Sequence, residues 1–119
     1  MRQAMRVLPE SIEIGAFAVT GNCLQAEIHL VLGAWADGKE YRRSERLALF
    51  VEPIGDEIGV AVYDAVLDMP SLLVVAEHAA ARLDTAAGRA LLKMAAEAPK
   101  QPRRWLPQVR VPFPKAGAE

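Results

Sequence analysis

Cysteine is nearly absent from this chain, since Cys23 is the single example among 119 residues. One cysteine cannot form an internal disulfide, and it can build neither a CxxC redox pair nor a cysteine-based zinc site. The two histidines, His29 and His78, do not stand in an HxxxH, HxH or HExxH spacing that would bind a metal ion. The composition therefore predicts no metal and no other cofactor, and it favours a reducing compartment.

Long apolar runs are also absent. The longest strictly apolar stretch, residues 72–76, is far shorter than the ~20 residues that a membrane span needs. Near the N-terminus, Arg2 and Arg6 are followed by proline and glutamate instead of the apolar run of a signal peptide. We therefore expect a cytoplasmic protein that does not cross a membrane. Arginine outnumbers lysine 10 to 4 and alanine occurs 21 times, a usage common in GC-rich bacterial genomes.

The common catalytic and nucleotide-binding motifs are missing as well. No serine stands in the GxSxG context that exposes a nucleophile, and no histidine lies near Cys23 in the sequence. The 8 glycines form neither GxGxxG nor GxxxxGK[ST], so nucleotide binding has no support. We assign no catalytic residue and expect a protein that acts by binding.

Charge is distributed unevenly in a chain that is 52% apolar and 24% charged. Residues 1–99 carry 9 basic and 14 acidic side chains, whereas residues 100–119 carry 5 basic side chains and 1 acidic one. A chain of this size buries roughly two-thirds of its unfolded surface, which is enough for one core. We predict one α+β domain over residues 1–99. Residues 100–119 contain four prolines, so they are predicted to form an extended, basic tail.

Three glycine-containing dipeptides indicate tight turns between strands: Gly21-Asn22, Asp37-Gly38 and Gly55-Asp56. They delimit four strands, of which residues 24–36 alternate most clearly between apolar and polar positions. Folding about the turns pairs apolar with apolar residues, which predicts one buried sheet face. Residues 57–67 are interpreted as the fourth strand, although their acidic side chains would also line one side of a helix.

A helical period begins at Pro70 and ends before Pro99. Gly88 or the Asp84-Thr85 pair could break this helix in two. Its apolar surface is wider than one sheet would cover, so we expect another surface to pack on it. This is either the tail or a second subunit, and we expect a homodimer. The predicted fold is α+β: a four-stranded antiparallel β-meander packed by one long, or broken, C-terminal helix and followed by the extended tail.

Charged side chains fall on the core-facing side at one end of the predicted sheet. The predicted register brings together Glu13, Arg43, Glu45 and Asp64. Charges at such positions are costly unless they are paired or solvated. The functional hypothesis is a half-open pocket for a polar ligand, with the carboxylates available for acid–base work. The alternative is that the helix leaves this end uncovered and the charges pair in solvent, and a bulge in the third strand would also turn Arg43 and Glu45 outward.

The tail combines basic with aromatic residues. Its candidate contact residues are Arg103, Arg104, Trp105, Arg110 and Phe113. They could pack an extended segment into an apolar groove or onto a sheet edge, of the same chain or of a twin. They could instead anchor a different protein, or contact phosphates and bases of a nucleic acid.

Three functional hypotheses follow from these features. The first is a small non-enzymatic adaptor, inhibitor or chaperone-like protein that binds another protein through its sheet, its helix surface and its basic tail. The second is a ligand-binding protein or minor enzyme that uses the charged cluster. The third is nucleic-acid binding through the tail, which the acidic charge of residues 1–99 disfavours.

Overall fold

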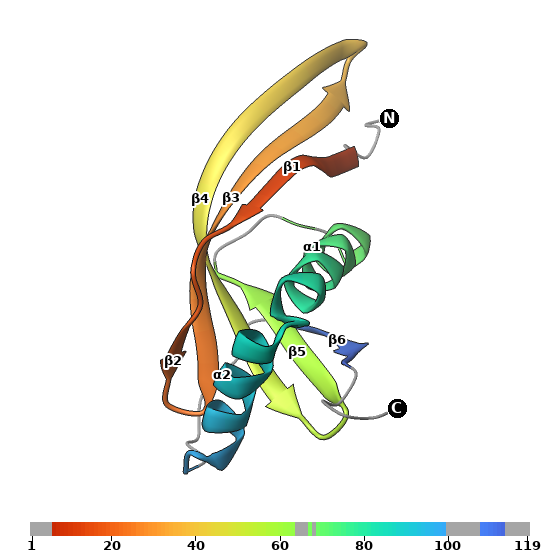
Figure 1. Cartoon of the computed structure of the whole chain (residues 1–119). Coiled ribbons are helices and arrows are strands. Elements are labelled where there is room, and N and C mark those ends of the chain that lie inside the picture. The colour runs from red at the N-terminus through yellow and green to blue at the C-terminus, as the bar shows by residue number, and fades with distance from the viewer. Residues whose placement is uncertain (1–5, 64–66, 68, 100–107, 114–119) are drawn as a thin grey trace.

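The computed structural model of the chain describes residues 6–63, 67, 69–99 and 108–113. It shows an α+β fold in which two helices pack on one face of a curled antiparallel sheet (Figure 1). The strands lie in the order β1-β3-β4-β5-β6, with the short strand β2 also paired to β3. The α+β class and the antiparallel sheet predicted from the sequence are confirmed.

The central strands follow the predicted turns. Strand β3 is Cys23–Ala36, β4 is Lys39–Ile54 and β5 is Glu57–Val62. The Asp37-Gly38 turn between β3 and β4 has a positive φ at both residues, which is the requirement of a type I′ hairpin turn. The register that this turn imposes is uninterrupted from Ala36 opposite Lys39 to Leu24 opposite Val51. Residues 57–62 are a strand, as predicted, and residues 64–66 lie outside the described residues.

The N-terminal strand departs from the four-stranded prediction because it is divided into β1 (Arg6–Ile14) and β2 (Ala18–Thr20). Both parts pair with β3, but the register shifts at Glu10 and again between Ile14 and Ala18. Each shift inserts one extra residue into the strand, so all residues upstream of it change faces.

The predicted long helix is two helices. Helix α1 is Met69–Leu83 and helix α2 is Ala86–Glu97. Thr85 starts α2 as its N-cap, because its side-chain oxygen accepts a 2.9 Å hydrogen bond from the backbone N–H of Gly88. The break therefore lies at the Asp84-Thr85 pair. Neither helix in the described part of the chain is long and apolar enough to cross a membrane.

Strand β6, Val109–Pro112, was not among the four predicted strands. It lies beside β5 in antiparallel register, with Val111 opposite Ile58. Val111 is buried in the core, and Phe113 packs against the core from just beyond the strand. The C-terminal segment thus adds to a sheet edge of its own chain, one of the arrangements that its alternation allows.

One hydrophobic core lies between the helices and the inner sheet face, which we define as the face that the helices cover. Strand β3 contributes its even-numbered residues from Leu24 to Leu32, β4 contributes Leu49 and Val51, and β5 contributes Ile58, Val60 and Val62. From α1, Leu72, Val75 and Leu83 close the core. Burial of these apolar side chains is the main favourable contribution to folding.

Candidate functional site in the hairpin extension

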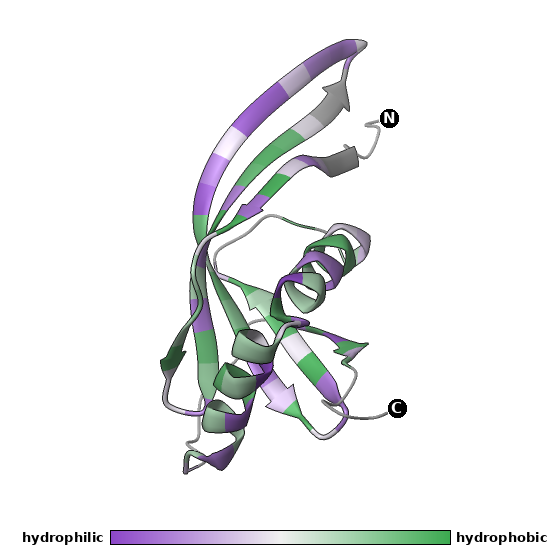
Figure 2. Ribbon diagram, viewed as in Figure 1, coloured by the Kyte–Doolittle hydropathy of each residue, from purple (hydrophilic) through white to green (hydrophobic). Residues whose placement is uncertain are grey.

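Strands β3 and β4 are much longer than their neighbours, with 14 and 16 residues. Their distal part, residues 30–47, projects past the two helices and is here termed the hairpin extension (Figure 1). Strand β4 is largely hydrophilic along this part, as Figure 2 shows, whereas hydrophobic and hydrophilic residues alternate in the sheet beside the helices. Leu30 and Leu32, at the base of the extension, are buried in the core, and the remainder of the extension presents polar surface and backbone beyond the helical layer.

Among the described residues, the β4 side of the hairpin extension is an open edge. Strand β5 pairs with β4 only between Leu49 and Ile54, and the backbone N–H of Tyr63 donates to the carbonyl of Ala48 just beyond. Within the described ranges, no strand pairs with β4 on that side between Lys39 and Leu47. The side chains from Lys39 to Ser44 are all exposed.

Backbone groups along the open edge alternate in direction. In an antiparallel strand the N–H and C=O of one residue point to the same side, and those of the next residue point to the opposite side. Since Ala48 bonds toward β5, the residues an even number of positions away have backbone groups that point to the open edge. These residues, termed the edge residues, are Glu40, Arg42, Ser44 and Arg46.

The inner face of the extension carries two of the four residues predicted to bind a ligand. Glu45 lies opposite Leu30, and Arg43 lies opposite Leu32, in the register expected from the Asp37-Gly38 turn. Arg43 Nε lies 2.7 Å from Glu45 Oε2, and the Arg43 side chain is 57% exposed. The pair is solvated at the rim of the core, so its net contribution to stability is small.

Glu13 is a correction to the predicted cluster. The sequence register placed Glu13 on the inner face opposite Leu30, but Ile12 occupies that position and Glu13 lies opposite His29 on the outer face. The extra residue between Ile14 and Ala18 causes this change. It brings Ile12 and Ile14 to the core in place of a serine and a glutamate, which is the more favourable burial.

The outer face brings together three polar side chains, of which two share a hydrogen bond and two lie at ion-pair distance. His29 Nε2 lies 2.5 Å from Ser44 Oγ, and His29 Nδ1 lies 3.6 Å from Glu13 Oε1. The three residues come from three adjacent strands, β3, β4 and β1. A carboxylate, an imidazole and a hydroxyl in this order can polarise the hydroxyl or hold a polar ligand.

Further ion pairs surround this cluster on the outer face. Arg46 Nη1 lies 3.6 Å from Glu27 Oε1, while Arg42 lies 3.0 Å from Glu10 and 3.5 Å from Glu40. A shallow hollow lined by Gln25, Glu27, Arg46 and Tyr63, among others, lies beside them. The outer face is therefore charged but internally compensated.

Sequence reasoning placed His29 on the outer face beside Arg46, and these two residues lie opposite each other in the sheet. It did not find the contacts of His29 with Ser44 and Glu13. The contact with Ser44 could have been predicted, because the register set by the Asp37-Gly38 turn places Ser44 diagonally across from His29. The contact with Glu13 could not have been predicted, because no sequence signal indicates the extra residue upstream of Ala18.

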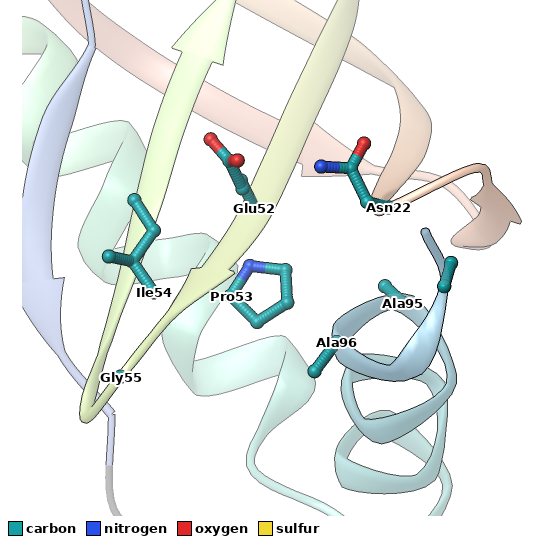
Figure 3. A pocket seen from close by; sticks show the side chains of 8 residues that line it. Asn22, Glu52, Pro53, Ile54, Gly55, Ala95 and Ala96 are labelled. Atoms are coloured by element: carbon teal, nitrogen blue, oxygen red, sulfur yellow. The ribbon is translucent and has the colours of Figure 1, made fainter. Parts of the chain in front are cut away.

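A second hollow, of about 220 Å³, lies at the opposite end of the sheet between the β4–β5 turn and the C-terminal end of α2 (Figure 3). Its polar lining side chains are Asn22 and Glu52, and alanines of α2 form much of the remainder. Ligand sites are usually larger than about 300 Å³ and carry several convergent polar groups. This hollow offers too few polar contacts to define a ligand.

The remaining predicted residues are divided between the described and undescribed parts of the chain. Asp64, Arg103, Arg104 and Trp105 lie outside the described residues. Arg110 is exposed on β6, opposite Gly59, and Phe113 is half-buried against the core. The described residues thus bring Arg43 and Glu45 together and place Glu13 on the other face.

Helix α1 carries apolar residues on its solvent side as well as on its core side. Met69, Leu73 and Val74 are 51%, 40% and 39% exposed. Their spacing places them on neighbouring positions of the first helical turns. The wide apolar helix surface expected from the sequence is present at this end of α1.

Within the described ranges, no three or more His, Cys, Asp and Glu side chains lie close enough together to hold a metal ion. Comparison of the chain with protein-family models gives no match, and neither do comparisons with curated proteins and with solved structures.

Proposed function

We propose that this protein is a small non-enzymatic protein-binding module, of the adaptor, inhibitor or chaperone-like kind. Its sheet takes up an extended segment of a partner along the open edge of β4. The observation that supports this is the row of backbone donors and acceptors at the four edge residues, beside which the described part of the chain has no strand. In strand addition the backbone ladder gives affinity, and alternate side chains give specificity.

At the hairpin extension, β1 and β4 are the two edge strands of the sheet among the described residues, and they differ in how each edge is protected from further pairing. Proteins guard exposed edges with proline, bulges and charged side chains. Strand β1 has both Pro9 and a register shift at Glu10. The open edge of β4 has neither device between Lys39 and Leu47, and its register with β3 is regular. Its charged side chains remain, and they restrict binding to partners of complementary charge.

Two other surfaces contribute to the proposal. The exposed residues Met69, Leu73 and Val74 give α1 an apolar area beyond its core contacts, and such areas are common in interfaces. The basic tail supplies Arg103, Arg104 and Trp105, residue types that anchor protein interfaces.

The test uses proline at an edge residue. The N–H of Ser44 points away from β3, so Ser44→Pro removes a donor from the open edge without removing one from the β3–β4 ladder. Ser44→Ala is the matched control, since it also loses the His29 contact but keeps the N–H. Immobilised wild type and Ser44→Ala are expected to capture the same proteins from native lysate, and Ser44→Pro to lose them. Equal capture by all three would contradict strand addition.

A second candidate function is ligand binding or acyl-ester hydrolysis on the outer face. The 2.5 Å contact between His29 Nε2 and Ser44 Oγ favours it. His29 would accept the Ser44 proton as the hydroxyl attacks an ester carbonyl and pass it to the departing alcohol, and water would then release the acyl group as a carboxylic acid and restore the Ser44 hydroxyl. Turnover of a p-nitrophenyl ester that is lost in Ser44→Ala and retained in Ser11→Ala would support it. Equal turnover by the two variants would exclude it.

Nucleic-acid binding through the tail remains the third candidate. It requires affinity that falls steeply with salt and that is lost when residues 100–119 are removed.

A further inference from the structure

We propose that the segment received at the open edge of β4 is the same edge of a second copy of this chain. Two antiparallel β4 strands then join two hairpin extensions into one continuous sheet. This inference rests on the proposed function, because it names the partner for the same edge. Three features support it: the direction of the edge backbone, the room left by Tyr63, and the side chains that come to face each other.

The direction of the backbone limits the register. Residues opposite each other in an antiparallel pair have side chains on the same sheet face, and hydrogen-bonded pairs need both backbones to point at each other. Edge residues of one copy must therefore lie opposite edge residues of the other. A two-fold axis satisfies this condition when it passes through a residue position of β4, such as 42, 43 or 44.

Tyr63 decides between these positions. Its N–H bonds the Ala48 carbonyl, so Tyr63 already occupies the place beside Ala48 at the end of the open edge. An axis at position 43 would set Lys39 beside Leu47 of the second copy, one strand step of about 3.4 Å from that copy's Tyr63. This is too close for two unbonded chains. An axis at position 44 would shift the second strand by two more residues and set Glu40 beside Ala48 of the second copy, the place that Tyr63 occupies.

The axis at Arg42 leaves this space free and uses most of the edge. Glu40 lies opposite Ser44 of the second copy, Ser44 opposite its Glu40, and Arg42 opposite its Arg42. Each pair exchanges two backbone hydrogen bonds. Moving the axis further toward the Asp37-Gly38 turn loses bonds, because the edge residues then face the turn, where φ is positive.

The inner-face side chains are self-complementary in this register. Lys39 lies opposite Glu45 of the second copy, and Tyr41 lies opposite its Arg43. The first pair joins opposite charges, and the second places an aromatic ring beside a guanidinium. Tyr41 is 50% exposed in the single chain, and Glu45 already contacts Arg43 of its own chain. The dimer therefore gives the exposed Tyr41 ring a partner and extends the Arg43–Glu45 pair to Lys39.

One like-charge contact occurs, on the outer face at the axis, where the two Arg42 side chains meet. Each Arg42 already lies 3.0 Å from Glu10 and 3.5 Å from Glu40 of its own chain. Acidic groups therefore flank both guanidinium groups, and the contact is compensated locally.

The first test is the solution mass of the full chain by light scattering or sedimentation, up to about 1 mM protein, where even a millimolar Kd populates the dimer. The wild type and Ser44→Ala are expected to reach twice 12.9 kDa. Ser44→Pro is expected to stay a monomer, with its fold checked by circular dichroism. A wild-type monomer at every concentration would overturn the inference, as would a Ser44→Pro dimer.

The second test addresses the register by charge reversal. Lys39→Glu and Glu45→Lys each set like charges against each other in both symmetry-related pairs, so each variant alone is expected to dimerise at least about tenfold more weakly. An equal mixture restores both pairs, because positions 39 and 45 then carry opposite charges wherever they face each other across the axis. The mixture is therefore expected to form a heterodimer of near wild-type affinity. If the mixture is as weak as its components, the register is wrong.

The two proposals fail in different ways. If the wild type is a monomer but Ser44→Pro still loses captured proteins, the second copy is not the partner and strand addition stands. If the wild type is a monomer and all baits capture the same proteins, both proposals fall.

Discussion

Glu13 Oε1 lies 3.6 Å from His29 Nδ1 on the outer face of the sheet, and the Arg43–Glu45 pair lies on the opposite, inner face. This relationship exists because one extra residue between Ile14 and Ala18 reverses the faces of β1. Ile12 and Ile14 consequently contact the core, and the intervening Glu13 is exposed to solvent.

The face reversal can be tested by truncating neighbouring side chains. Ile14 is 7% exposed, so Ile14→Ala is expected to lower the free energy of unfolding by about 2–4 kcal/mol through lost burial and a residual cavity. Glu13→Ala removes an exposed side chain, so it is expected to change stability by no more than about 0.5 kcal/mol. Urea denaturation followed by circular dichroism measures both. A larger loss of unfolding free energy in Glu13→Ala than in Ile14→Ala would show that Glu13 lies on the inner face.

The start of α2 depends on one hydrogen bond. Thr85→Ala removes the acceptor for the Gly88 N–H and is expected to cost about 1 kcal/mol. Thr85→Ser keeps the oxygen and is the control, expected to unfold within a few tenths of a kcal/mol of wild type. Thermal unfolding at matched protein concentration compares them. Identical losses for both variants would assign the effect to the Thr85 methyl group instead of the cap.

Position 88 requires glycine, because its backbone lies very close to the backbone of Leu83 at the end of α1. A Cβ at this position would clash with the Leu83 carbonyl oxygen. In an unobstructed helix, glycine to alanine stabilises by about 1 kcal/mol, but here the clash reverses the sign. We expect Gly88→Ala to destabilise by about 1–3 kcal/mol, against a near-neutral Ala87→Ser control at an exposed neighbouring position. A more stable Gly88→Ala variant would show that the two helices are further apart.

Strand β6 contributes to the core through Val111, which is 6% exposed. Val111→Asp would bury an unpaired carboxylate and is expected to cost more than about 3 kcal/mol. Arg110→Asp, on the adjacent exposed position, is expected to cost less than about 1 kcal/mol. Hydrogen exchange of the β5 amides should rise in Val111→Asp alone. Equal and small effects of both variants would mean that the C-terminal segment is not docked in solution.

Much of the fold was predictable from short-range signals. The Asp37-Gly38 turn determines the pairing of β3 with β4, and so the positions of Arg43 and Glu45 opposite Leu32 and Leu30. The Asp84-Thr85 pair was one of two places where the predicted helix could break, and it is the place where α1 ends and α2 begins.

The candidate site was predictable only in part. The charged inner-face pair could be found, because it depends on a two-residue turn that directly sets the register. The contact of Glu13 with His29 and the open edge could not, since they depend on an irregularity in the N-terminal strand and on where β5 stops pairing with β4.

The sequence by itself determined the strands that its turns define, the helical period after Pro70 and the chemistry available on each strand, because these follow from backbone preferences and from alternation along the chain. Only the tertiary structure decided that Glu13 faces His29, that Val111 completes the core beside Ile58, and that β4 is longer than the strand beside it. These outcomes arise from competition among distant segments for the same buried surface. The segment that buries the most apolar surface occupies the site, and no local sequence pattern shows which segment that is.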